Sequence, residues 1–199
     1  MKNTSIDFYI EKFSKFDPEK FNLSEVPMLV RRKLGQLDKG ILAPVFEIYE
    51  DGIEEIVFSS EFGEIDRLNT IIESYREFNE VSPIKFSGSV HNYPAGLICQ
   101  LKGITIPYHA ISAGENSLST GLVKSFISDK SKVIFCYGES FPATKSVACL
   151  ISKSGSGIKC RFTKSAIEGE SDEFSAFEKF LTGDVTTFKT PCGIIERVE

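Results

Sequence analysis

The amino-acid sequence predicts an α/β domain built on a mixed, mostly parallel sheet with helices on its faces. Short runs rich in β-branched and aromatic residues alternate with longer segments whose apolar residues recur at helical spacing. This alternation is typical of strand–helix–strand units. With 199 residues and an apolar share of 41%, the chain is long enough to bury a substantial core. We therefore expect a folded globular protein rather than a disordered chain.

The first 25 residues carry no clear period. Charged, polar and aromatic residues are mixed, as in FYIEKFSKFDPEKFNLSE, and we expect an irregular segment over residues 1–25 that is not a signal peptide. Pro27 then begins a short predicted helix, where its missing N–H costs little. In the apolar stretch that follows, Pro44 is expected to kink or restart any helix.

Strands and helices alternate between residues 54 and 140. The predicted strands are short and apolar, whereas the predicted helices show apolar residues three and four positions apart. In chain order we expect a strand over 54–60, helices over 64–78 and 92–103, and strands over 104–112 and 132–140.

The last third of the chain predicts a hairpin and a helix. Two alternating runs flank the Ser/Gly turn SKSGSG and indicate a β-hairpin over 145–165, and this turn lacks the pattern of a phosphate-binding loop. An amphipathic helix over 171–183, acidic at its start, is expected to stop at Gly183. We predict one domain over 26–165 and a C-terminal extension over 166–199, of a short helix plus a strand, packed on that domain.

Composition excludes several classes of function. The net charge of −5 is mild and spread out, which argues against nucleic acid as a partner. Five cysteines without C-x-x-C spacing and only two histidines indicate reduced thiols, neither a metal site nor a cofactor, and a cytoplasmic setting. No apolar run is long enough to predict a membrane span.

The stretch ISAGENSLSTGLVKSF, residues 111–126, joins a predicted strand to a predicted helix. Ser112 and Glu115 match the S-x-x-E capping box, so we expect Ser112 to be structural. The alternative is a small acyl or thioester hydrolase that uses Ser112 with Glu115 and either His91 or His109. Such a nucleophile needs a base and an orienting group, and the G-x-S-x-G pattern is missing.

Four segments occur in an order that resembles a known family. They are PMLVRRKLGQLDKGIL, VFSSEFGEIDRL, SPIKFSGSVHNYPAGLICQLKG and HAISAGENSLSTGL. Together they are similar to the N-terminal domain of β-ketoacyl synthases, and more closely to the chain length factor type found in aryl polyene and related gene sets. The resemblance implies one half of a thiolase-like fold.

The resemblance also implies that the nucleophile is missing. In an active ketosynthase the last segment reads T-A-C-S-S-S-L, and the helix N-terminus lowers the pKa of the cysteine thiol. Aligning its leucine with Leu118 puts Gly114 at the cysteine position. The two catalytic histidines of the family come from a C-terminal half that these 199 residues do not reach. The vestigial active-site position would then comprise Ser112, Ala113, Gly114, Glu115 and Asn116.

The remaining candidate residues concern partners. The resemblance makes Arg31, Arg32 and Lys33 a candidate patch for an acidic acyl carrier protein. His91 and Asn92 precede a predicted helix, which Asn92 is expected to cap, and they are candidate residues of a vestigial acyl pocket.

The resemblance further implies that the strand before residue 112 lies at a dimer interface. This strand contains Pro107 and no Asp, Glu, Lys or Arg, which favours an edge strand that meets a partner. A homodimer or a heterodimer with a ketosynthase is expected, centred on Tyr108, His109, Ala110 and Ile111.

Taken together, the sequence predicts a non-catalytic, chain-length-factor-like protein of fatty-acid or aryl-polyene-type biosynthesis. Its partner would be an active ketosynthase or an acyl carrier protein. Two alternatives stay open at this point: the hydrolase described above, and a structural homodimer without an acyl partner.

Overall fold

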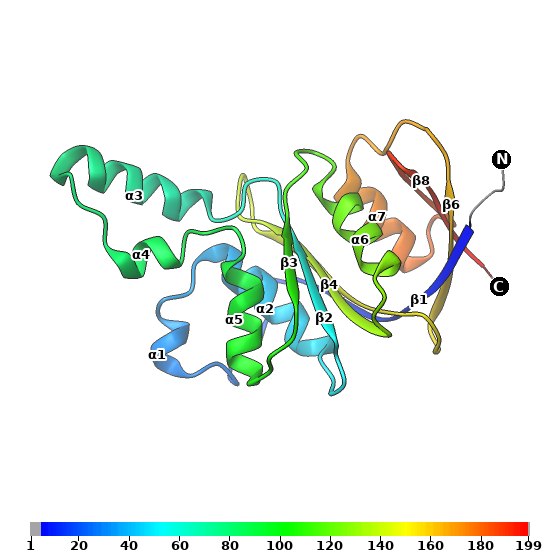
Figure 1. Ribbon diagram of the computed structural model, residues 1–199, viewed down its shortest axis with the longest axis horizontal. Helices are drawn as coiled ribbons and strands as arrows, with labels where there is room; N and C mark the ends of the chain where they lie inside the picture. Colours follow the sequence, from blue (N-terminus) through cyan, green and yellow to red (C-terminus); the bar gives the residue numbers. More distant parts are fainter. Residues whose placement is uncertain (1–4, 199) are drawn as a thin grey trace.

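One eight-stranded sheet organises the protein in the computed structural model, which describes residues 5–198 (Figure 1). The strand order is β3-β2-β4-β5-β1-β6-β8-β7. The strands are β1 (Ser5–Lys15), β2 (Glu55–Ser59), β3 (Tyr108–Ile111), β4 (Lys132–Glu139), β5 (Lys145–Ser152), β6 (Ile158–Lys164), β7 (Thr187–Thr190) and β8 (Gly193–Arg197).

Helices cover both faces of this sheet, and the expected α/β class is confirmed. Successive residues of β4 point to opposite sides: Ile134 packs with α2 and α5, whereas Phe135 packs with α6 and α7. The helices are α1 (Met28–Arg31), α2 (Gln36–Ile48), α3 (Ile65–Phe78), α4 (Pro83–Ser87), α5 (Tyr93–Lys102), α6 (Ser117–Ile127) and α7 (Glu173–Thr182).

The prediction of a mostly parallel sheet is wrong in detail. Only β3, β2 and β4 run parallel, because helices cross over between them. After β4 the chain turns directly into β5, and all the remaining pairs are antiparallel. Strand–helix alternation stops at residue 140, and parallel pairing stops with it.

The segment expected to be irregular over residues 1–25 contains a central strand instead. β1 lies between β5 and β6 and buries Phe8 and Ile10, while Asp7 on the other face forms a two-point ion pair with Arg161 of β6. Its register shifts between Ile10 and Lys12. Such a bulge breaks the two-residue alternation, which is why the sequence pattern gave no strand signal.

The hairpin predicted over residues 145–165 is also wrong. β5 and β6 each pair with β1, so the Ser/Gly turn passes over a third strand. Gly157 lies there with φ +109°, and a Cβ at this position would come within 2.4 Å of the Ile10 carbonyl oxygen. The close approach of two backbones therefore requires glycine.

Helix α2 continues through Pro44, contrary to the expected break. The proline ring leaves the Gly40 carbonyl without its usual helical N–H donor. The buried Ser146 hydroxyl of β5 donates to that carbonyl instead, at 2.5 Å. A sheet side chain thus replaces the hydrogen bond that the proline removes.

The C-terminal extension completes the far end of the sheet. The Asp172 carboxylate accepts from the Ser175 N–H at the start of α7, which ends at Gly183 with φ +89°. β8 pairs with β6, and β7 closes the edge. The extension therefore lies at the opposite end from β3 and does not cover it.

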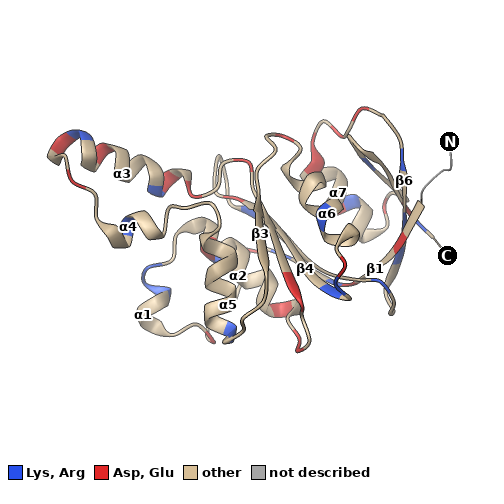
Figure 2. Cartoon of the chain, in the orientation of Figure 1, with Lys and Arg blue, Asp and Glu red and all other residues tan. Residues whose placement is uncertain are grey.

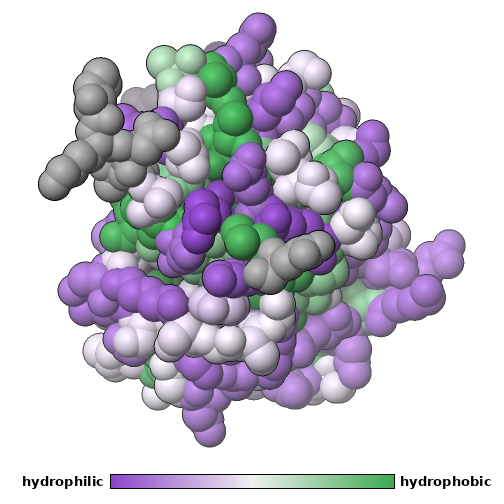
Figure 3. Space-filling view, turned by 90° about the vertical axis from the view of Figure 1, so that its right-hand side faces the viewer, coloured by the Kyte–Doolittle hydropathy of each residue, from purple (hydrophilic) through white to green (hydrophobic). Residues whose placement is uncertain are grey.

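The side of the molecule near the two chain ends is mainly hydrophilic (Figure 3). This agrees with β6, whose Lys159, Arg161 and Thr163 alternate with the more deeply buried Cys160 and Phe162. Residues 64–88, which include α3 and α4, instead project from the body on the other side as an arm (Figure 1).

We predict that Ser146→Ala lowers the free energy of unfolding by about 1–3 kcal/mol, because the buried Gly40 carbonyl loses its donor. Ser152→Ala is the matched control: it is buried in the same strand, and its hydroxyl has no hydrogen-bond partner among residues 5–198. Urea unfolding of both variants measures the difference. Equal losses of stability would show that the Ser146 hydrogen bond does not stabilise the proline-containing helix.

Candidate functional site

The free edge of β3 is the first feature of the site. β3 pairs with β2 on one side, and no other described strand pairs with it. Ile56 N–H donates to the Pro107 carbonyl and Ser60 N–H to the Ile111 carbonyl. In a parallel ladder, alternate residues face the same neighbour. The backbone groups of Tyr108 and Ala110 therefore point away from β2, toward the open edge.

The side chains of β3 leave this edge without a carboxylate, a lysine or an arginine. Figure 2 shows β3 in the colour of neutral residues. Tyr108 is 39% exposed and lies against Gly96 of α5, where a Cβ would come within 3.4 Å of its hydroxyl. The predicted interface residues thus lie together on an edge strand that is paired on one side only.

A buried carboxylate ties β3 to α6. Glu55 of β2 contacts the His109 imidazole at 2.8 Å and the Lys124 ammonium at 3.1 Å. Burial opposes ionisation of Glu55, but hydrogen bonds from Ser128 and Lys124 outweigh it and hold the pKa of Glu55 below its ordinary value. His109 is therefore engaged in holding the edge strand in place.

The turn over residues 112–116 does not form the predicted capping box. α6 begins at Ser117, and no side chain caps it from Asn116. The Ser117 hydroxyl accepts from Ala113 N–H at 2.9 Å and donates to the Gly114 carbonyl at 2.7 Å, so it organises the turn locally. Ser112 donates to the Glu61 carbonyl at 3.1 Å instead of capping the helix.

A carboxylate from the C-terminal extension occupies the N-terminus of α6. Glu173 of α7 accepts from the Ser119 N–H at 3.0 Å. Glu173 is buried, and burial raises its pKa above the ordinary value despite the hydrogen bonds it accepts. At the acidic start of α7, Asp172 accepts a hydrogen bond from α7 itself. Glu173 caps a neighbouring helix.

His91 lies beside the end of β3. Its Nε2 is 3.1 Å from the Ile111 carbonyl oxygen, and its ring packs against Phe58. Gly63 approaches the other ring nitrogen so closely that a Cβ would come within 2.5 Å of it. Asn92 precedes α5 at the capping position but makes no side-chain hydrogen bond to the helix, so the expected cap is not formed.

In the described part of the chain, neither Ser112 nor the four buried cysteines are activated as nucleophiles. Among the described residues, neither histidine hydrogen-bonds to the Ser112 hydroxyl. Burial raises the pKa of the thiols of Cys99, Cys136, Cys149 and Cys160. Within residues 5–198, no group of three or more His, Cys, Asp or Glu side chains could hold a metal ion.

Arg67 joins the arm to the body of the protein. Its guanidinium donates to the carbonyls of Lys33 and Gly88, at 2.8 and 2.7 Å, and pairs with the Asp38 carboxylate at 2.5 Å. It also lies over the Tyr93 ring at 5.1 Å. One side chain therefore fixes both ends of the arm and the loop after α1.

Glu64 is a second carboxylate beside Asp38, and both side chains are almost fully buried. Burial and the negative charge of Asp38 raise the pKa of Glu64 to about 8. Arg67 is 3.4 Å from Glu64 but 2.5 Å from Asp38. Its charge is therefore matched by Asp38, and Glu64 stays protonated at neutral pH.

The basic patch lies next to this cluster. Arg31 ends α1, and Arg32 and Lys33 follow it as an exposed segment that Figure 2 shows in blue. Lys33 also lines a pocket between α1, the arm and α5. No sequence pattern identifies Arg67, Glu64 or Glu173, because their roles depend on elements distant in the chain.

The comparisons with known proteins agree with this geometry. A family model described as the N-terminal domain of β-ketoacyl synthases matches residues 10–170. No curated protein matches the sequence. None of the helices in the described part of the chain has the length and apolar character needed to cross a membrane.

Two solved structures show a similar fold. One is a chain in the complex of the ketosynthase ApeO with its chain length factor ApeC from Xenorhabdus doucetiae. It has a TM-score of 0.75 and 20% identity, over 97% of this chain and 100% of that chain. The other is the ishigamide ketosynthase/chain length factor, with a TM-score of 0.54 and 11% identity, over 75% of this chain and 55% of that chain. The expected thiolase-like architecture is confirmed.

We predict that the stability of the wild-type protein falls as pH rises from 5 toward 8, relative to Glu64→Gln. The folded state keeps a proton on Glu64 up to about pH 8, whereas the unfolded chain releases it near the ordinary value of 4.5. The folded state therefore binds more protons in this window, and raising the pH favours unfolding.

Urea unfolding at several pH values measures this difference. Glu73→Gln, an exposed substitution on α3, the helix that Glu64 precedes, is the control and should follow the wild type. Parallel curves for Glu64→Gln and the wild type across this window would contradict the raised pKa of Glu64.

Proposed function

The chain belongs to the β-ketoacyl synthase N-terminal domain family, and from this premise we propose that it is a non-catalytic, chain-length-factor-like partner of an active ketosynthase. The observation that carries the proposal is the open, uncharged edge of β3 directly before a turn without a cysteine. An exposed strand edge without charges is a ready template for pairing with another chain. The proposed partner supplies that pairing.

The turn at Gly114 supports a non-catalytic role. Gly114 is exposed with φ +59°, and its segment contains no thiol. A helix N-terminus lowers a thiol pKa because its free N–H groups and dipole favour negative charge. In this protein the buried Glu173 carboxylate already accepts a hydrogen bond from an N–H group at the N-terminus of α6. We infer that the N-terminus of α6 stabilises the fold through Glu173 and does not activate a nucleophile.

The basic patch supports docking of an acidic carrier protein. Arg31, Arg32 and Lys33 form no ion pair with a carboxylate in the described part of the chain. Unpaired surface cations raise the encounter rate with an acidic partner. We place the chain in fatty-acid or aryl-polyene-type biosynthesis as a scaffold that receives such carriers together with the ketosynthase.

The purified chain is expected neither to condense nor to decarboxylate a malonyl carrier protein. Gly114→Cys alone should not restore either reaction, since Glu173 keeps the helix end occupied. Carbon dioxide release, measured beside an active ketosynthase as positive control, tests both statements. Turnover by the wild type that survives replacement of all five cysteines but is lost in Ser112→Ala would instead establish a serine-dependent enzyme.

Ala110→Glu is expected to abolish the complex between this chain and its proposed ketosynthase partner, because the new charge lies at the centre of β3. Thr187→Glu is the matched control, an exposed substitution on β7 at the opposite edge of the sheet. Light scattering of the mixtures gives the masses, and circular dichroism confirms that each variant folds. If the wild type stays separate from the ketosynthase, the heterodimer is wrong. A wild-type homodimer that Ala110→Glu splits would favour self-pairing.

A further inference from the structure

We propose that the pocket between α1, the arm and α5 binds an aliphatic chain with an anionic head group. This site lies apart from β3, and the inference does not depend on pairing with a ketosynthase. It rests on the pocket's walls, its unpaired cations and the rigid frame around Arg67.

The walls of the pocket are largely apolar. Its volume is about 570 Å³, which falls in the range of small-molecule sites. Leu29 of α1 and Ile84 of α4 both line the pocket and are 70% and 74% exposed, so a bound aliphatic chain would remove much of their surface from water. Val30 and Leu97 add apolar surface between them.

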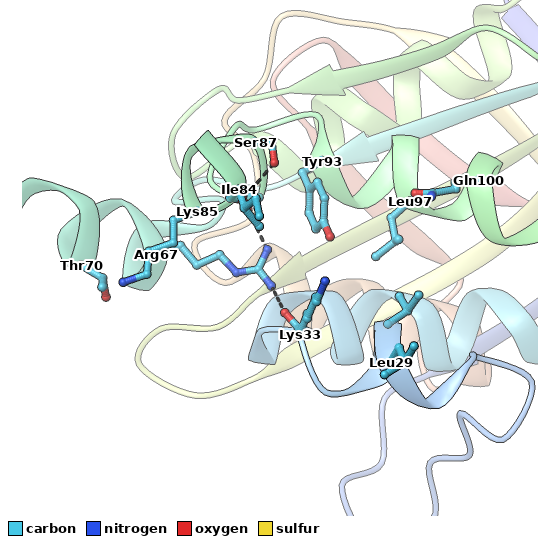
Figure 4. Close-up of a pocket in the computed structure, with 12 residues that line it drawn as sticks. Leu29, Lys33, Arg67, Thr70, Ile84, Lys85, Ser87, Tyr93, Leu97 and Gln100 are labelled. Atoms are coloured by element: carbon cyan, nitrogen blue, oxygen red, sulfur yellow. Dashed lines mark hydrogen bonds between the residues drawn. The ribbon is translucent and has the colours of Figure 1, made fainter. Parts of the chain in front are cut away.

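The charge at the pocket is positive. Lys33 and Lys85 line it, and neither pairs with a carboxylate in residues 5–198, whereas Arg67 is matched by Asp38. Figure 4 shows the Lys33 ammonium pointing toward the Tyr93 hydroxyl across the pocket. An anionic head group can therefore accept hydrogen bonds from a cation and a hydroxyl at one end of the apolar space.

The frame of the pocket is fixed before any ligand binds. Arg67 holds the Lys33 carbonyl on one side and the Gly88 carbonyl on the other, and both residues line the pocket. A site held open in this way avoids part of the ordering cost of binding. A cationic or neutral aliphatic ligand would leave Lys33 without a counter-charge, so the anion is the favoured class.

Nuclear magnetic resonance of the chain alone tests the inference. Decanoate, added below its micellar concentration, is expected to shift the amide signals of Lys33, Gly88 and Leu97. Butanoate has a much shorter alkyl chain than decanoate, and decyltrimethylammonium carries a positive charge in place of the negative one. Both should therefore produce much smaller shifts. Decyl phosphate, run in parallel, distinguishes a phosphate head group from a carboxylate.

Two substitutions at exposed positions separate the contribution of the positive charge from that of the apolar wall. Lys33→Met should weaken decanoate binding severalfold, and Ile84→Glu should abolish it, whereas Lys153→Met on the distant Ser/Gly turn should leave it unchanged. The inference fails if decanoate produces no localised shifts, or if the cationic and anionic chains bind equally. It also fails if the same signals shift with protein concentration alone, since the occupant would then be a second copy of the chain.

Because the titration uses the isolated chain and leaves β3 untouched, failure here would not affect the proposed pairing. Loss of pairing in Ala110→Glu would likewise leave decanoate binding intact.

Discussion

The pairing of β1 on both of its sides determines the shape of this protein. β1 joins the β4–β5 hairpin to the β6–β8–β7 half, and the sheet would fall into two separate parts without it. The resulting sheet has two edges of opposite character. β7 exposes Thr187 and Lys189, and a lysine on an edge strand discourages further pairing. β3 exposes Tyr108 and carries no such charge, so the two edges are not equivalent.

The helices on the β3 side are organised around buried charge. Glu55 links β3 to α6, Glu173 links α6 to the C-terminal extension, and Asp38 with Arg67 links α2 to the arm. Removing one partner of such a buried pair is costly, since the other charge is left uncompensated. These carboxylates therefore hold the edge strand, the turn over residues 112–116 and the pocket in a fixed arrangement, in a protein for which we propose binding in place of catalysis.

Much of the local structure could be predicted, because it depends on neighbouring residues. The apolar runs of β2 and β4, the helical spacing of α3, and the glycine stops at Gly103 and Gly183 are all confirmed. The failures have a common cause in distant contacts. The bulge in β1 interrupts the alternation by which a strand is recognised. β1 lies between the two strands expected to form a hairpin. The Ser146 hydroxyl donates the hydrogen bond that allows α2 to continue through Pro44.

The candidate site was only partly accessible from sequence for the same reason. The edge residues of β3, the missing cysteine and the basic patch could be identified by pattern and resemblance. Glu173 and Arg67 could not, because a charged residue gives no sign in sequence of which distant backbone it will contact. The S-x-x-E pattern at Ser112 was misleading because the Ser117 hydroxyl takes over the turn.

Hydrogen exchange at β3 tests the central claim most directly. In the isolated chain, the amides of Tyr108 and Ala110 face the open edge and should exchange quickly, while those of His109 and Ile111 should be protected by β2. When the chain is mixed with its proposed ketosynthase partner, Tyr108 and Ala110 should become protected. A stable complex in which these two amides still exchange quickly would contradict the proposal that β3 meets the partner.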